Sequence, residues 1–156
     1  NNHLTCWVGL DDASEDNGCL YFVPGSHKWG LLPITGLTGD MDAVRKVLTP
    51  EQNKAMDNKF ANVLKKGYAS FHHPICMHGS YTNASNRQRR AVVLNVMADG
   101  TRSNVDALKR PEDLQGFPII PQDEKMAGTF YPVLFDKDME LIKTIIDEIP
   151  TINDFD

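Results

Sequence analysis

Residues 72–91, HHPICMHGSYTNASNRQRRA, gather three histidines and three arginines around a turn. Imidazoles can bind a metal ion, and the planar fork of a guanidinium can hold a carboxylate through two hydrogen bonds. In a strand over 89–97, Arg89 shares a face with Ala91, Val93 and Asn95. Burying a guanidinium alone is costly, so this arginine needs a partner, and a bound carboxylate fits. A lone histidine near a turn is more often structural than a metal ligand, which leaves the role of His78 open on these residues alone.

Short strands separated by turn residues must position these side chains. Alternation of apolar and polar residues predicts strands over 3–10, 19–23, 60–64, 68–73, 75–80 and 89–97, the first two forming a hairpin. The strand over 75–80 turns His78 and Ser80 to the same side. Residues 26–49 have no sustained period, as is typical of a long lid or binding loop.

Two helices complete the expected elements. A short one begins at Pro50 with Thr49 as its N-cap. A C-terminal helix over 136–149 is indicated by Met139, Ile142, Ile145 and Ile146 at helical spacing. Many short strands followed by a helix favour a mainly β fold, a sandwich or barrel of the jelly-roll type with the C-terminal helix on its outer face.

Composition narrows the class of protein. The 156 residues are 41% hydrophobic and 24% charged with a net charge of −5, which predicts one domain over 1–156 and argues against a nucleic-acid partner. No apolar run reaches the roughly 18 residues of a membrane helix, and no signal peptide is evident, so we expect a cytoplasmic protein without a membrane partner. The three cysteines lack a disulfide or zinc spacing and are expected to be reduced thiols: Cys6, Cys19 and Cys76.

Two long motifs carry a family resemblance. The segments WVGLDDASEDNGCLYFVPGSHKWG, at 7–30, and KKGYASFHHPICMHGSYTNASNRQRRA, at 66–91, resemble the phytanoyl-CoA dioxygenase family of iron(II)- and 2-oxoglutarate-dependent oxygenases. The resemblance implies a double-stranded β-helix, a cupin-like jelly roll, with its metal site between the two sheets. It also implies decarboxylation of 2-oxoglutarate to succinate, coupled to hydroxylation of an aliphatic C–H bond in a small-molecule substrate.

The same resemblance implies roles for four residues. His78, in the H-G-S block, corresponds to the distal iron ligand. Arg89, eleven residues later, corresponds to the arginine that holds the far carboxylate of 2-oxoglutarate, and Ser80 to a serine bonded to that carboxylate. Trp7 corresponds to a tryptophan beside the cosubstrate, although plain core packing is the alternative for it.

One part of the family pattern is missing. Its facial triad needs a second histidine and an acid from an H-x-D motif before the tryptophan, and none of the five histidines here is followed by an acid two residues later. We therefore expect this chain to be the C-terminal portion of a longer oxygenase, incomplete at the N-terminus and inactive by itself. Tyr68 stands where the family usually has Asp, which affects only a local turn.

Several interpretations remain open. His72 and His73 are expected to have packing or supporting roles, His27 to bond the backbone of its turn, and Arg87 and Arg90 to be surface charges. The acids of 11–16 are expected to form a solvated turn. If the missing motif carries Gly or Ala in place of the acid, the protein is a halogenase. The other alternative is a non-catalytic module that binds a small carboxylate through Arg89 and Ser80. Uncovered sheet edges would allow two copies to pair.

Overall fold

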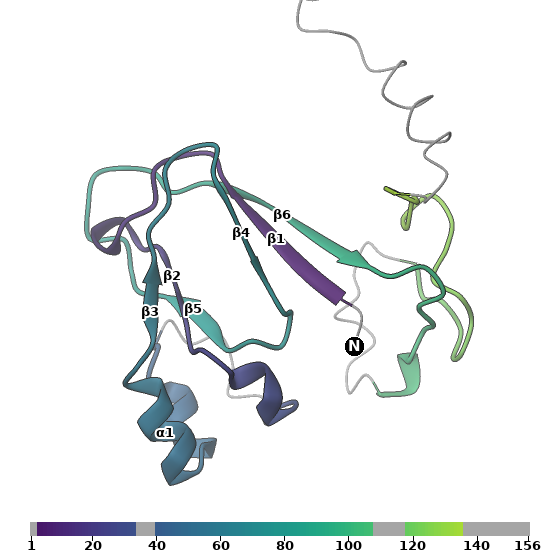
Figure 1. Cartoon of the computed structure of the whole chain (residues 1–156), viewed down its shortest axis with the longest axis horizontal. Helices are drawn as coiled ribbons and strands as arrows, with labels where there is room; N and C mark the ends of the chain where they lie inside the picture. Colours follow the sequence, from purple (N-terminus) through teal and green to yellow (C-terminus); the bar gives the residue numbers. More distant parts are fainter. Residues whose placement is uncertain (1–2, 34–39, 108–117, 136–156) are drawn as a thin grey trace, which may run out of the picture. The chain divides into compact units, whose positions relative to one another are not determined.

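The computed structural model describes residues 3–33, 40–107 and 118–135, and it divides the chain into two compact units, Asn1–Met97 and Ala98–Asp156 (Figure 1). The single domain expected over 1–156 stays a prediction.

The first unit contains two antiparallel sheets of three strands each, in the orders β4-β1-β6 and β3-β2-β5 (Figure 1). In the first sheet β1 (His3–Gly9) is central and pairs with β4 (Ala69–His72) and β6 (Ala91–Met97). In the second, β2 (Leu20–Phe22) pairs with β3 (Phe60–Asn62) and β5 (His78–Ser80). The predicted mainly β class is confirmed, and the described strands do not close into a barrel.

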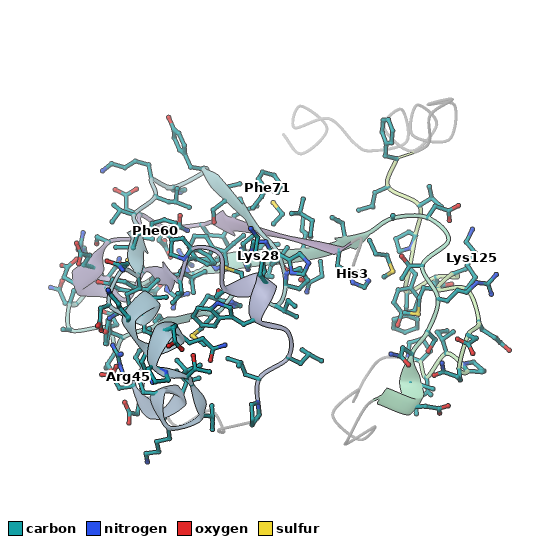
Figure 2. The ribbon with its side chains drawn as sticks, turned by 60° about the horizontal axis from the view of Figure 1, so that its bottom comes forward. His3, Lys28, Arg45, Phe60, Phe71 and Lys125 are labelled. Atoms are coloured by element: carbon teal, nitrogen blue, oxygen red, sulfur yellow. The ribbon has the colours of Figure 1, made fainter. Side chains whose placement is uncertain are left out.

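The two faces of the β4-β1-β6 sheet differ in chemistry. Thr5 and Trp7 of β1 are 7% and 4% exposed, and their face looks toward the other sheet. The opposite face, which we call the outer face, is apolar throughout. Its cross-strand partners are Leu4, Cys6 and Val8 of β1, Ala69 and Phe71 of β4, and Val92, Leu94 and Val96 of β6. Phe71, labelled in Figure 2, is 64% exposed. The more apolar face of β1 is therefore the less buried one.

The predicted hairpin of the first two strands is wrong, because β1 and β2 belong to different sheets. The turn between them is too structured to be a simple hairpin loop. It contains a 3-10 helix, Glu15–Asn17, and the buried Asn17 side chain donates to the carbonyl of Asp12 at 2.8 Å while accepting from the backbone N–H of Ser14 at 2.8 Å. These bonds redirect the chain from one sheet to the other.

Gly18, which ends this turn, combines two constraints. Its φ is +82°, and a Cβ added there would lie 2.9 Å from the Tyr81 carbonyl oxygen. Gly25 has nearly the same φ, +79°, but a Cβ added to it would have nothing within 4 Å. We expect Gly25→Ala to lower the free energy of unfolding by about 1–2 kcal/mol from the left-handed backbone alone. Gly18→Ala should lower it by about 1–3 kcal/mol more, because the Tyr81 backbone must also move.

Urea unfolding followed by circular dichroism would measure both glycine variants. Equal losses for the two variants would contradict the close approach of Tyr81 to Gly18.

The helix predicted at Pro50 is confirmed as α1 (Pro50–Met56). Thr49 accepts from the Gln52 backbone N–H, and the Gln52 side chain accepts from the Thr49 backbone N–H, so the capping is reciprocal. Arg45, labelled in Figure 2, pairs with Asp57 at the end of α1 at 2.9 Å. The described part of the 26–49 excursion contains the 3-10 helices Ser26–Trp29 and Ala43–Val47.

The strand predicted over 75–80 is shorter than expected, because β5 begins only at His78. Pro74 has no backbone N–H to donate to a sheet, and the Cys76 N–H bonds the His73 carbonyl at 2.8 Å in a turn. His78 and Ser80 still share one face, as predicted, because both lie within β5. Gly79 between them faces the other way, and a Cβ there would lie 2.5 Å from Met41 Sδ. The excursion thus covers the outside of β5.

The second unit has little regular structure in its described ranges, 98–107 and 118–135. It contains a 3-10 helix, Val105–Ala107, and an antiparallel bridge between Arg102 and Lys125. The predicted C-terminal helix over 136–149 lies outside the described residues. Within the described ranges, no helix has both the length and the apolar character needed to cross a bilayer.

Candidate functional site

The candidate site lies between the inner faces of the two sheets in the first unit. Side chains of the two sheets contact each other there. The rings of Phe22 on β2 and His72 on β4 lie 4.7 Å apart between centroids, and Asn62 Nδ2 on β3 donates to Ser70 Oγ on β4 at 2.9 Å. Side chains from β1, β4, β5 and β6 therefore face the same region between the two sheets.

Arg89, Ser80 and Trp7 are brought together. Arg89 Nη2 donates to Ser80 Oγ at 3.4 Å, and the guanidinium carbon lies 5.9 Å from the centre of the Trp7 ring. Arg89 is half-buried and Trp7 is buried, so the guanidinium lies against an apolar wall. The structure gives Arg89 no carboxylate partner among the described residues. The roles of Arg89, Ser80 and Trp7 in binding the cosubstrate stay predictions.

The neighbouring arginines behave differently. Arg87 pairs with Asp16 at 2.6 Å and Arg90 with Asp11 at 2.9 Å, and both arginines are exposed. Hydrogen bonding to Arg90 holds the pKa of Asp11 well below its usual range. The predicted surface role of Arg87 and Arg90 is confirmed. The acidic turn is more than solvated, since Asp11 and Asp16 are ion-paired to these arginines and Asp12 to Lys65.

His78 is exposed at the start of β5, and its ring orientation is fixed by the backbone. Its Nδ1 lies 2.7 Å from the Cys76 carbonyl oxygen. A carbonyl can only accept, so Nδ1 is the donor, and in the neutral imidazole the lone pair is then on Nε2. Metal-binding histidines typically donate one ring N–H to a protein group in this way and bind the metal through the other nitrogen.

His72 lies beside His78, with ring centroids 4.9 Å apart. Its Nδ1 is buried and has no hydrogen-bond partner among the described residues. Burial, and then the nearby His78, lower the pKa of His72. His73 points elsewhere and packs against the ring of His27 at 5.5 Å. The turn before His27 is closed by Ser26, whose Oγ donates to the Val23 carbonyl at 2.7 Å.

Sequence reasoning missed the polar lining of the inner face. Thr5 Oγ1 donates to Asn95 Oδ1 at 2.8 Å across the directly paired strands β1 and β6. The period of two along β1 had already placed Thr5 on the same face as Trp7, so this signal could have identified Thr5. The bond provides the buried Thr5 hydroxyl with the hydrogen-bond partner that most buried polar groups have.

The donor set fits part of an iron and 2-oxoglutarate site. His78 offers one nitrogen ligand and Arg89 with Ser80 a carboxylate site. Within ranges 3–33, 40–107 and 118–135, no three His, Cys, Asp or Glu side chains lie together as a metal site. These ranges therefore do not contain a complete facial triad, and the role of His78 as an iron ligand stays a prediction.

Comparison with known proteins shows that the chain is similar to oxygenases. A family model described as phytanoyl-CoA dioxygenase matches residues 1–91. The methylphosphonate hydroxylase of Gimesia maris is 30% identical over 108 residues, which cover 64% of this chain and 35% of that protein. The peroxisomal phytanoyl-CoA dioxygenase of Homo sapiens is 33% identical over 92 residues, covering 57% and 26%. The chain spans about a third of the length of the curated relatives it matches.

Among solved structures, the non-heme α-ketoglutarate-dependent epimerase SnoN from nogalamycin biosynthesis superposes with a TM-score of 0.60. It is 22% identical, and the match covers 86% of this chain and 48% of that chain. At this identity the likeness shows the fold, and it confirms the predicted cupin-like class.

Proposed function

Because the chain belongs to the phytanoyl-CoA dioxygenase family, we propose that it supplies the cosubstrate end of an iron(II)- and 2-oxoglutarate-dependent dioxygenase that hydroxylates a small molecule. The observation that carries the proposal is Arg89, a half-buried guanidinium bonded to Ser80 and without a carboxylate partner in the described part of the chain. The first histidine and the acid of the triad are proposed to come from outside these 156 residues.

Arg89 and Ser80 are suited to one end of a dicarboxylate. A guanidinium presents parallel N–H groups that match a carboxylate, and a hydroxyl beside it can donate a further bond. The Trp7 ring excludes water from one side, which strengthens the charge interaction. These residues would hold the far carboxylate of 2-oxoglutarate.

His78 is suited to the other end of the same molecule. Same-face residues two apart in a strand are separated by about 6.6 Å, and four C–C bonds of about 1.5 Å place the carboxylate carbons of extended 2-oxoglutarate about 5 Å apart. A ligand anchored near Ser80 thus reaches the region of His78 along β5. His78 Nε2 would hold iron there.

When bound, iron(II) would supply the redox chemistry through which dioxygen oxidises 2-oxoglutarate to succinate and carbon dioxide and hydroxylates the substrate. The residues of this chain contribute position and environment. The Cys76 carbonyl fixes the proton of His78 on Nδ1. Phe22, which is buried and in ring contact with both His72 and His78, keeps that end of the site apolar.

Succinate release tests the proposed function. The protein as its gene encodes it, supplied with iron(II), 2-oxoglutarate and oxygen, is expected to form succinate, which proton NMR can measure. A metal chelator should stop the formation of succinate. The 156-residue chain by itself is expected to form none, since one imidazole cannot retain a labile divalent ion. An encoded protein that binds neither metal nor 2-oxoglutarate would refute the proposal.

A further inference from the structure

His72 has a feature that packing does not explain. Its Nδ1 is shielded from solvent and has no hydrogen-bond partner in the described ranges, although most buried polar atoms in proteins are paired. A side chain chosen only to pack against Phe22 would be better served by an apolar ring, because the unpaired nitrogen destabilises the fold. The position therefore calls for a bound partner.

The direction of the missing partner follows from the neighbours of His72. The ring lies opposite Thr5 on β1, faces the space between the sheets, and is 4.9 Å from the His78 ring between centroids. A ligand held beside His78 would therefore also lie beside the His72 ring.

We propose that His72 donates a hydrogen bond from Nδ1 to the metal-binding keto-acid end of 2-oxoglutarate, opposite the end held by Arg89 and Ser80. This inference rests on the proposed function and adds a cosubstrate-binding residue to it. His72 is not proposed as a metal ligand, because a further imidazole would fill a coordination position that 2-oxoglutarate or oxygen needs.

The test compares variants of the encoded protein by their affinity for 2-oxoglutarate, measured by calorimetry with zinc as a metal that does not turn over. His72→Phe keeps an aromatic ring against Phe22 but removes the donor. It should weaken 2-oxoglutarate binding about 10- to 100-fold, the usual range for a hydrogen bond to a charged group. His72→Asn can place an amide N–H near the position of Nδ1 and should restore most of the affinity.

His73→Phe is the matched control, because His73 packs against His27 and away from His78. It should leave the affinity unchanged. Urea unfolding in the absence of ligand adds a second readout. His72→Phe should unfold at the same urea concentration as wild type or a higher one, since it removes an unpaired polar atom. A merely structural role would instead lower stability and affinity together.

The outcomes separate the two proposals. If wild type binds 2-oxoglutarate and His72→Phe binds it equally well, the role of His72 is refuted and the proposed function stands. If His72→Asn binds as weakly as His72→Phe, the hydrogen bond is refuted. If wild type does not bind 2-oxoglutarate in the presence of zinc, both proposals are refuted.

Discussion

Replacing Arg89 with alanine is expected to weaken binding of 2-oxoglutarate by about 30-fold or more. Truncating one partner of a desolvated, hydrogen-bonded charge pair typically costs about 2–5 kcal/mol, and each 1.4 kcal/mol is about a factor of ten in affinity. Arg89 lies against the buried Trp7 ring, where water screens its charge weakly. Lysine should restore only part of the affinity, because it keeps the charge but lacks the planar fork.

The matched control is Arg90→Ala. Arg90 is the next residue, carries the same charge, and is occupied by Asp11 at 2.9 Å. Its loss should leave the affinity for 2-oxoglutarate within about twofold, because exposed ion pairs contribute little. Ligand-observed NMR can follow weak binding to the 156-residue chain, and calorimetry can follow the encoded protein with zinc. If both alanine variants bind alike, the assignment of Arg89 is wrong.

Replacing Trp7 with alanine is expected to lower the free energy of unfolding by about 3–5 kcal/mol. Trp7 is 4% exposed and forms the core of the first unit with Ala13 and Cys19. The structure around a truncated core side chain relaxes only partly, so a cavity remains. Because small domains are stable by only about 5–15 kcal/mol, the variant would lose a large share of its stability.

Trp29→Ala is the comparison for this prediction. Trp29 is only half-buried, on the 3-10 helix Ser26–Trp29, so its removal should cost clearly less. Urea unfolding followed by far-ultraviolet circular dichroism measures both variants. Should the two losses be equal, Trp7 would not be the centre of the core. Trp7→Phe, which retains most of the apolar volume, provides a folded variant if Trp7→Ala does not fold.

The sequence predicted best those features that depend on neighbouring residues. Thr49, Pro50 and Gln52 specify the start of α1 through local hydrogen bonds, and the structure confirms it. The eleven-residue spacing from His78 to Arg89 likewise reflects a local path, out along β5 and back to β6. Because the chain turns back between the two residues, the Arg89 side chain comes close enough to donate to Ser80.

Features that depend on distant pairing were harder to predict. Nothing local in residues 3–23 shows that β1 pairs with β4 and β6, seventy or more residues away in the latter case, rather than with β2. A turn at Pro74 shortens the strand that was expected to begin at Ile75. The alternation of apolar residues does not reveal this turn. A packing or supporting role was expected for His72, because the missing hydrogen-bond partner of its Nδ1 can be recognised only once the surrounding structure is known.

The apolar outer face of the β4-β1-β6 sheet has a practical consequence in the laboratory. Dyes that fluoresce on contact with hydrocarbon surfaces will bind Phe71, Leu94 and their neighbours while the chain is fully native. A dye-based melting curve would therefore start from a high signal and report little when the core opens. Screening of variants should rely instead on circular dichroism or on the intrinsic emission of the two tryptophans.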